Sequence, residues 1–474
     1  MNRVTAIADN PAQPAATAVL YGAWPHDRAA GMLPGLLLAL ALLHGLLYLL
    51  IVPPWQHYDE PTHFEYVRLI ALWDRWPALN ETDLATSREI ADSMYRFRFW
   101  QPGVRPNLFG AQPPNIGISE KLHPPLYYSV AAVPVRWLRH LSIEQQLYAA
   151  RLIAVLLYLL VVICAWRIAT IVAPDRPLIQ LIVPLLIILV PAFADQMSAV
   201  NNDSLVNFSI TALLLGCVLL IRDGLRPLPL LLATLGLAVA VLTKRTALVG
   251  ALPFGLALLW SIRRNPLRWW AWLAGTMMLG IVVGYAALEY GPAGWTIRPW
   301  LADLDRRYLR ISLEQIAALL PNWANISPSY PLVFDVLFTS FWVRFGWGNV
   351  GMGWVWDWAM HAVVLAGVVG LIAALWSRGG DRLLWQRRVV WLFAATVLVA
   401  WIAAVARFEA QPGGYIPRGR YMHLAIVPTV WLLALGFERL VPSRWRAHSL
   451  LGLVVFFAAL DLAALGGALS DFYR

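Results

Sequence analysis

The chain has 474 residues, of which 59% are hydrophobic and 14% are charged. Many apolar runs approach the ~20 residues that cross a bilayer, so the composition excludes a soluble protein and predicts a polytopic helical membrane protein. The net charge of +10 comes mostly from arginines in short loops, which indicates membrane topology and not nucleic-acid binding. Cys164 and Cys217 lie inside apolar runs and are expected to be free thiols.

The apolar segments follow an irregular Ala/Pro-rich tail, residues 1–30, which is expected to be cytoplasmic. They are approximately Leu33–Val52, Leu126–Leu138, Leu147–Val172, Leu178–Ala192, Leu205–Ile221, Leu228–Leu242, Thr246–Ile262, Trp269–Leu288, Trp358–Trp376, Val389–Ala406, Met422–Phe437 and Leu450–Leu469.

The positive-inside rule places the arginine-rich connections around 222–226, 263–268, 378–388 and 439–446 in the cytoplasm. If all twelve segments crossed the membrane, the loop 54–123 would be cytoplasmic, so this loop is external only if one early segment does not cross the membrane. The weakest is Leu126–Leu138, which is short and contains Pro134, so we expect it to be re-entrant or juxtamembrane. The prediction is one domain, residues 31–474, of about 11 spans (11–13), with a non-cytoplasmic C-terminus. Two external loops, 54–123 and 290–356, are expected to hold juxtamembrane helices.

The first external loop opens with the densest polar stretch, Asp59-Glu60-Pro61-Thr62-His63-Phe64-Glu65-Tyr66. One interpretation is a solvated loop helix with Asp59 as its N-cap and Pro61 in the first turn. The other is a catalytic or metal site, because carboxylates and histidines can provide a general base or bind a divalent ion.

All concentrated polar clusters fall on the external face of this topology, and ionisable groups at membrane depth tend to line substrate paths. Besides the first stretch, the clusters are Lys121-x-His123-Pro-Pro-Leu-Tyr127-Tyr128, Asn201-Asn202-Asp203, Lys244-Arg245, Arg344 with Gly346-Trp347-Gly348, and Arg418-Gly419-Arg420-Tyr421. Lys121 and Lys244 are the only two lysines in the chain. Lys244, Arg245, Arg418 and Arg420 are at predicted helix ends and could bind a phosphate at the interface.

Each cluster also has a plain structural interpretation. Lys244 and Arg245 could simply snorkel from the end of a span, and the Asn-Asn-Asp run could cap the following helix. Arg418 and Arg420 could be interfacial anchors, and His123 a turn residue. The tryptophans between 323 and 358 fit an aromatic belt better than a sugar platform.

The motifs together resemble the GT-C superfamily of polytopic glycosyltransferases, and more closely a bacterial membrane family called domain of unknown function 2142. The resemblance covers residues from about 33 to 440. It rests on Asp59-Glu60-Pro61-x-His63-Phe64, His123-Pro124-Pro125-Leu126-Tyr127-Tyr128, Asn201-Asn202-Asp203, Leu242-Thr243-Lys244, Ser340-Phe341-Trp342 with Phe345-Gly346-Trp347, and Gly419-Arg420-Tyr421.

The resemblance implies a bacterial inner-membrane enzyme with its active site on the periplasmic face. It would move a sugar from a polyprenyl-phosphate donor to a cell-envelope glycan or lipid-linked acceptor, in one inverting displacement. Asp59, with Glu60 beside it, would be the catalytic base. The candidate ligands of the donor phosphate would be Lys244, Arg245, Arg420, Lys121 and His123.

His63, Asn202, Asp203, Tyr127, Arg344, Arg418 and Tyr421 are the supporting residues expected around this site. His63 and His123 could complete a site for Mg²⁺ or Mn²⁺ with one of the acids. Two alternatives remain: a transporter or flippase for lipid-linked glycans, which would carry polar residues through its spans, and a non-catalytic protein of envelope assembly.

Overall fold

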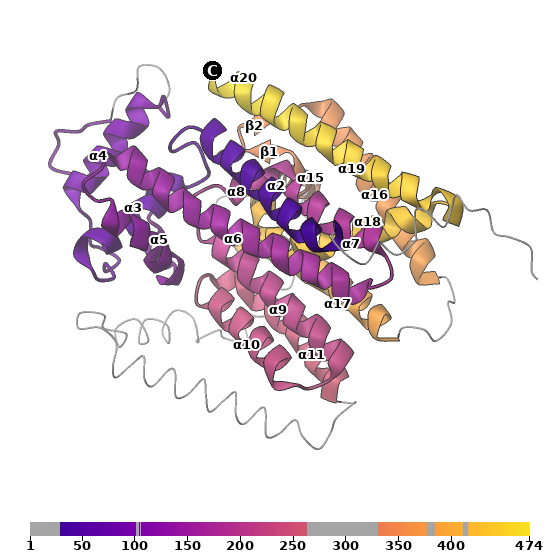
Figure 1. Ribbon diagram of the computed structural model, residues 1–474. Helices are drawn as coiled ribbons and strands as arrows, with labels where there is room; N and C mark the ends of the chain where they lie inside the picture. Colours follow the sequence, from indigo (N-terminus) through magenta and orange to yellow (C-terminus); the bar gives the residue numbers. More distant parts are fainter. Residues whose placement is uncertain (1–28, 101–103, 105, 263–329, 377–383, 411–415) are drawn as a thin grey trace, which may run out of the picture.

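The computed structural model describes residues 29–100, 104, 106–262, 330–376, 384–410 and 416–474. These residues form helices and one two-stranded antiparallel sheet (Figure 1). The α-helices are α2 (Ala29–Ile51), α3 (Glu60–Trp73), α4 (Leu84–Arg96), α5 (Leu126–Trp137), α6 (Ile143–Val172), α7 (Pro177–Ile188), α8 (Pro191–Gln196), α9 (Asp203–Asp223), α10 (Pro227–Val241), α11 (Ala251–Ile262), α15 (Tyr330–Trp342), α16 (Trp354–Trp376), α17 (Leu384–Ala410), α18 (Ile426–Leu440), α19 (Arg446–Ala463) and α20 (Ser470–Tyr473). The shorter elements are η1 (Glu120–Leu122), η2 (Arg245–Gly250), β1 (Arg344–Phe345), β2 (Val350–Gly351), η5 (Gly419–Ala425), η6 (Ser443–Trp445) and the π-helical turn η7 (Ala464–Leu469).

Among the described residues, seven helices are long and apolar enough to cross a membrane, and four more are apolar but shorter. The predicted class, an all-α polytopic membrane protein, is therefore confirmed. The predicted span Trp269–Leu288, most of the N-terminal tail and residues 290–329 of the second external loop lie outside the described residues. The long helices are Met32–Ile51, Ile143–Val172, Asp203–Asp223, Trp354–Ala373, Leu384–Phe408, Gly419–Leu440 and Ser443–Tyr473, and the shorter ones are Pro177–Ile188, Pro227–Val241, Thr246–Ile262 and Tyr330–Trp342.

Two predicted segments differ from simple spans. The segment Leu126–Leu138 becomes α5, which has only 12 residues and is in neither group of apolar helices, in agreement with the expectation that it does not cross. The segment Leu178–Ala192 is divided into α7 and α8, with Val190 extended between them at φ −80° and ψ 106°. Pro191 explains the break, because the residue before a proline is biased away from helical geometry.

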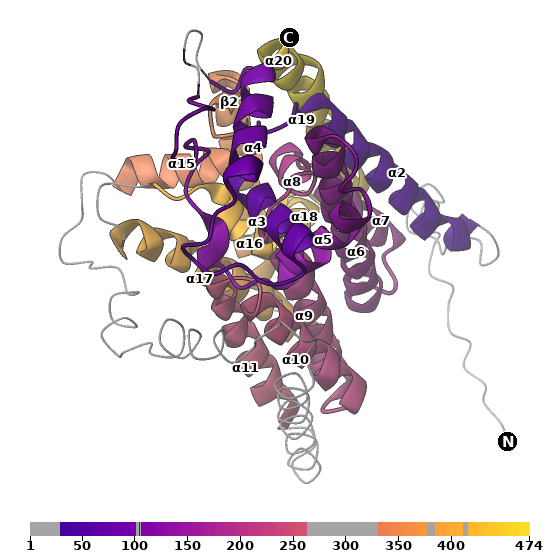
Figure 2. The ribbon, with the colours of Figure 1, turned by 90° about the vertical axis from the view of Figure 1, so that its left-hand side faces the viewer.

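Helix α3, in the loop predicted to be external, is buried, which disagrees with the interpretation of this stretch as a solvated loop helix. All residues from Glu60 to Ala71 are buried, and α3 packs against α4 and α5. Figures 1 and 2 show these three helices gathered at one end of α6, while α9, α10 and α11 pack together away from them. The polar side chains of α3 therefore face protein and need internal partners.

Arg151 of α6 supplies the central partner. Its side chain is fully buried, and its Nε and one Nη donate to the two oxygens of Glu60 at 2.8 and 2.6 Å. The remaining N–H groups donate to the backbone carbonyls of Leu49, Val52 and Pro53 at 2.8 to 3.0 Å. All five guanidinium N–H groups are thus used, and Arg151 joins the C-terminal end of α2 to the start of α3.

Both oxygens of the Glu60 carboxylate also have all their hydrogen-bond partners inside the protein. Besides Arg151, the carboxylate accepts the backbone N–H groups of Trp55 at 3.0 Å and of Val200 at 3.2 Å. Burial alone would raise the pKa of Glu60, but the charges of Arg151 and His57 outweigh it and hold the pKa below its usual range. The stability from this ion pair is therefore present at neutral pH and is lost only as the pH falls through the lowered pKa.

A second buried polar contact joins α2 to α19. Asp461 accepts the Tyr48 hydroxyl at 2.8 Å and lies 2.8 Å from Nε2 of His44. A lone acid in a span is costly, and these two partners offset that cost.

Removing one member of the Arg151–Glu60 pair should destabilise the protein. We expect Arg151→Met to cost about 3–5 kcal/mol, because it leaves a buried, unpaired carboxylate. The matched change Arg96→Met, at a side chain that is 54% exposed, should cost at most about 1 kcal/mol. The midpoint of thermal unfolding in detergent measures both. Equal midpoints for the two variants would contradict the central role of Arg151.

Candidate active site

Asp59 precedes α3 in the left-handed conformation, with φ 57° and ψ 10°, and its side chain makes no cap hydrogen bond. Asp59 thus occupies the N-cap position that one interpretation of the sequence gave it, but its side chain does not cap the helix. Its Oδ2 instead accepts Nη2 of Arg420 at 2.7 Å, and about a quarter of the side chain (23%) stays accessible. Left-handed backbone costs a non-glycine residue roughly 1–3 kcal/mol, and here it turns the carboxylate away from the helix.

The two neighbouring acids therefore have different surroundings. Asp59 is partly accessible, whereas Glu60 is fully buried and bonded to Arg151. Glu60 has no oxygen lone pair directed at an open space, so its geometry suits a structural ion pair and not proton transfer to a substrate.

Glu120 and His63 complete an acidic cluster around Asp59. Ligand atoms of Asp59, His63 and Glu120 all lie within 4.8 Å of one another. Nδ1 of His63 is hydrogen-bonded to the Tyr128 hydroxyl at 2.9 Å, while Nε2 faces Glu120 at 3.9 Å. This is how a metal-binding histidine is usually oriented by an outer partner.

The charges of the cluster suit a cation. Burial would raise the pKa of Glu120, but His63, His123 and Lys244 outweigh it and hold the pKa well below its usual range. Burial lowers the pKa of His63, which favours the neutral imidazole that binds metals. His123 does not join the three ligands directly but lies 3.0 Å from Glu120. Two carboxylates and one imidazole fit Mg²⁺ or Mn²⁺, the ions expected from the sequence.

Arg420 lies between two tyrosines. Its guanidinium carbon is 4.0 Å from the ring centroid of Tyr58 and 5.4 Å from that of Tyr421. The position is set by Gly419, whose backbone N–H donates to Ser340 at 2.7 Å. A Cβ on Gly419 would come within 2.2 Å of the Phe341 nitrogen, so only glycine permits this approach of η5 to α15.

A second basic group lies on the Tyr421 side. Lys244 is buried, forms an ion pair with Asp203, and has its ammonium 4.9 Å from the Tyr421 ring. Arg407, at the end of α17, lies over the same ring at 4.7 Å. Arg407 also lines a small groove with apolar and small residues, namely Thr246, Val249, Ala400, Ala403, Ala404 and Leu424, together with Tyr421.

The expected phosphate ligands are only partly brought together. Lys121 is directed elsewhere: its ammonium donates to the Glu81 carbonyl and lies 3.8 Å from Glu65. The side chain of Arg245 lies outside the described residues. Lys244 and Arg420 do share Tyr421, so these two remain candidates.

The Asn201-Asn202-Asp203 run both caps and contributes to the site. Asn201 accepts the Ser204 N–H at 3.2 Å, so the expected cap of α9 is made by Asn201. Asn202 is fully buried, and both atoms of its amide lack a partner among the described residues. Tyr127 is also fully buried, with its ring 5.4 Å from that of Tyr128.

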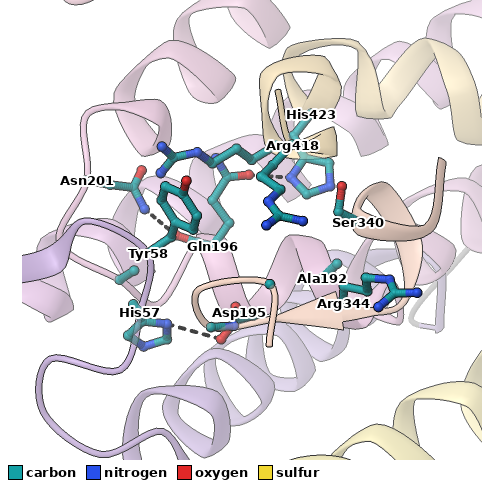
Figure 3. Close-up of a pocket in the computed structure, with 14 residues that line it drawn as sticks. His57, Tyr58, Ala192, Asp195, Gln196, Asn201, Ser340, Arg344, Arg418 and His423 are labelled. Carbon is teal, nitrogen blue, oxygen red and sulfur yellow. Dashed lines mark hydrogen bonds and ion pairs between the residues drawn. The ribbon is translucent and has the colours of Figure 1, made fainter. Parts of the chain in front are cut away.

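A pocket opens on the Tyr58 side of Arg420 (Figure 3). About 40 Å³ of it can be reached by a water-sized sphere, and its walls come from α8, the turn between β1 and β2, and η5. Arg418 and Arg344, two of the expected supporting residues, both line it. Asp195 on the floor lies 3.0 Å from His57.

Three residues of this region were not identified from the sequence. Glu120 is separated by only two residues from His123, and that His/Glu spacing was the available signal. Arg151 and Arg407 lie within or at the end of apolar runs, where a single arginine resembles a snorkelling anchor. An arginine inside a predicted span, such as Arg151, is nevertheless a recognised sign of an internal partner.

Comparisons with known proteins add little to this geometry. A scan against protein-family models and a search of curated proteins both gave no match, so membership of the family called domain of unknown function 2142 stays a prediction. Among solved structures, the chain is similar to ArnT from Cupriavidus metallidurans in the apo state, with 15% identity and a TM-score of 0.47. The match covers 94% of this chain and 68% of that chain. Similarity this distant carries no conclusion about activity.

The acidic cluster should bind Mn²⁺. We expect the purified full chain to hold one Mn²⁺ per protein, with Glu120→Gln and His63→Gln each lowering the affinity at least tenfold through loss of a ligand. Electron paramagnetic resonance of free Mn²⁺ measures this directly. Glu89→Gln, at a half-exposed carboxylate, is the matched control and should bind as the wild type does. Equal binding by the Glu120→Gln variant would exclude this site.

Proposed function

We propose that this chain is a membrane glycosyltransferase that moves a sugar from a polyprenyl-phosphate donor to a cell-envelope glycan or lipid-linked acceptor on the extracytoplasmic face. The observation that supports it is the meeting of all six sequence motifs in one contact network. The connecting pairs are Asp59–Arg420, His63–Tyr128, Asp203–Lys244, Lys244–Tyr421 and Ser340–Gly419.

Asp59 is the candidate base. It is the partly accessible acid of the opening pair and lies at the join of the acidic and basic groups. It would take the proton of an acceptor hydroxyl while that oxygen attacks the anomeric carbon of the sugar. The bond from this carbon to the donor phosphate breaks in the same step, which inverts the configuration and releases polyprenyl phosphate.

The basic groups would stabilise the leaving phosphate. Lys244, Arg407 and Arg420 surround the Tyr421 ring, and charge developing on a phosphate oxygen is stabilised by fixed cations. The groove beside Arg407 is lined by small and apolar side chains, which suits a prenyl chain approaching from the bilayer. A divalent ion held by Asp59, His63 and Glu120 would supply further positive charge when bound.

Replacing the base should abolish transfer. We expect Asp59→Asn to lower the rate at least ~10²-fold, because it removes the proton acceptor, while donor binding is not weakened, because Arg420 loses a competing carboxylate. A panel of radiolabelled polyprenyl-phosphate sugars, incubated with the full chain and with membranes from cells lacking the gene, measures transfer. Asp92→Asn, at a half-exposed carboxylate, is the control. Full transfer by the Asp59→Asn variant would exclude Asp59, and no transfer from any donor by the wild type would contradict the proposed function.

The two lysines provide a matched test of phosphate binding. We expect Lys244→Ala to raise the Kd for undecaprenyl phosphate about tenfold or more, since a charge-assisted contact is lost. Lys121→Ala should leave it within twofold, because Lys121 is bonded to Glu65 and the Glu81 carbonyl. Tryptophan fluorescence titration measures both constants. Equal effects of the two changes would remove Lys244 from the donor site.

A further inference from the structure

The pocket on the Tyr58 side of Arg420 contains one cation whose charge the described residues do not balance. Arg420 is paired with Asp59, and Asp195 lies beside His57. Arg344 donates to Thr339 and lies 3.7 Å from Asp357. The side chain of Arg418 makes no hydrogen bond or ion pair with another described residue. Figure 3 shows its guanidinium extending into the middle of the pocket.

The backbone of the opposite wall is shaped around Arg418. Gly348, in the turn between β1 and β2, has φ +83°, and a Cβ placed there would come within 2.8 Å of the guanidinium carbon. Any other residue would both strain this turn and displace the arginine. The guanidinium of Arg418 therefore lies in close contact with this turn.

A half-buried guanidinium with no partner among the described residues loses hydration without a replacement there, and an oxyanion would balance its charge and accept its hydrogen bonds. The 40 Å³ open to a water-sized sphere corresponds to about three water sites. That space suits the oxygens of a phosphate group. The groove on the other side of Arg420, beside Arg407, is apolar and separate from it.

We propose that this pocket is the acceptor subsite and that the acceptor carries a phosphate group, which Arg418 binds. The assignment to the acceptor rests on the proposed glycosyltransferase function, in which the donor phosphate lies among the cations around Tyr421 and its prenyl chain occupies the groove beside Arg407. Arg420, stacked between Tyr58 and Tyr421, divides the two sites. Asp59, bonded to Arg420, then lies at their boundary, where a base for the acceptor hydroxyl is needed.

Binding measurements test this without requiring turnover. Inorganic phosphate represents the acceptor group, and undecaprenyl phosphate represents the donor. We expect Arg418→Gln to weaken phosphate binding at least tenfold and undecaprenyl phosphate binding less than twofold, and Arg407→Gln to do the reverse. Arg444→Gln, at an exposed arginine in η6, is the control for loss of one charge. Unchanged phosphate binding by Arg418→Gln overturns the proposal. A loss of undecaprenyl phosphate binding equal to that of Arg407→Gln assigns the pocket to the donor instead.

A second measurement uses the wild-type protein and does not depend on the variants folding. Phenylglyoxal modifies accessible arginines, and mass spectrometry locates them. We expect inorganic phosphate to protect Arg418 and not Arg407, and undecaprenyl phosphate to protect Arg407. Labelling of Arg418 that phosphate leaves unchanged contradicts the proposal. Absence of sugar transfer with these protections intact would contradict the enzymatic function and leave the phosphate site standing.

Discussion

The hydrogen-bonded ion pair of Arg151 and Glu60 determines the rest of the site. Neighbouring residues of a helix point about 100° apart. Fixing Glu60 toward α6 therefore directs Asp59 elsewhere, and its left-handed backbone turns it to Arg420. The same carboxylate accepts the Val200 N–H, which brings the start of α9 to the start of α3. The buried pair thus orients the catalytic candidate without taking part in the chemistry.

The sequence predicted the long apolar helices because apolar length is a strong signal. Polar clusters are rare in such a chain, so they marked the stretches that meet in the candidate site. It could not divide the roles of Asp59 and Glu60, since both belong to one short motif and only the distant Arg151 distinguishes them. For Lys121, the sequence suggested a role in the site that its contacts do not support. Its rarity suggested function, yet its partners, Glu65 and the Glu81 carbonyl, are structural.

The tryptophans expected to form an aromatic belt fall into two groups, those exposed on a helix and those packed inside the protein. Trp354 and Trp358 are 74% and 71% exposed on α16, as a belt requires. Trp347 instead stacks on Tyr58 at 5.1 Å and donates to the Trp55 carbonyl at 3.3 Å. Composition alone could not separate them, because the distinction arises from the positive-φ glycines that turn the chain between β1 and β2. Trp347 supports the tyrosine on which Arg420 rests.

The ion pairs that Arg420 and Lys244 already form affect how tightly these cations could bind an anionic ligand. Arg420 and Lys244 are already paired, with Asp59 and Asp203, which offsets the cost of holding cations near apolar surroundings. In the proposed function, a donor phosphate would therefore compete with internal carboxylates, and part of its binding energy would be used to displace them. In the proposed mechanism, a phosphate that replaced Asp59 on Arg420 would free this carboxylate to face the acceptor. Arrival of the donor would in this way prepare the base on the side where the acceptor binds.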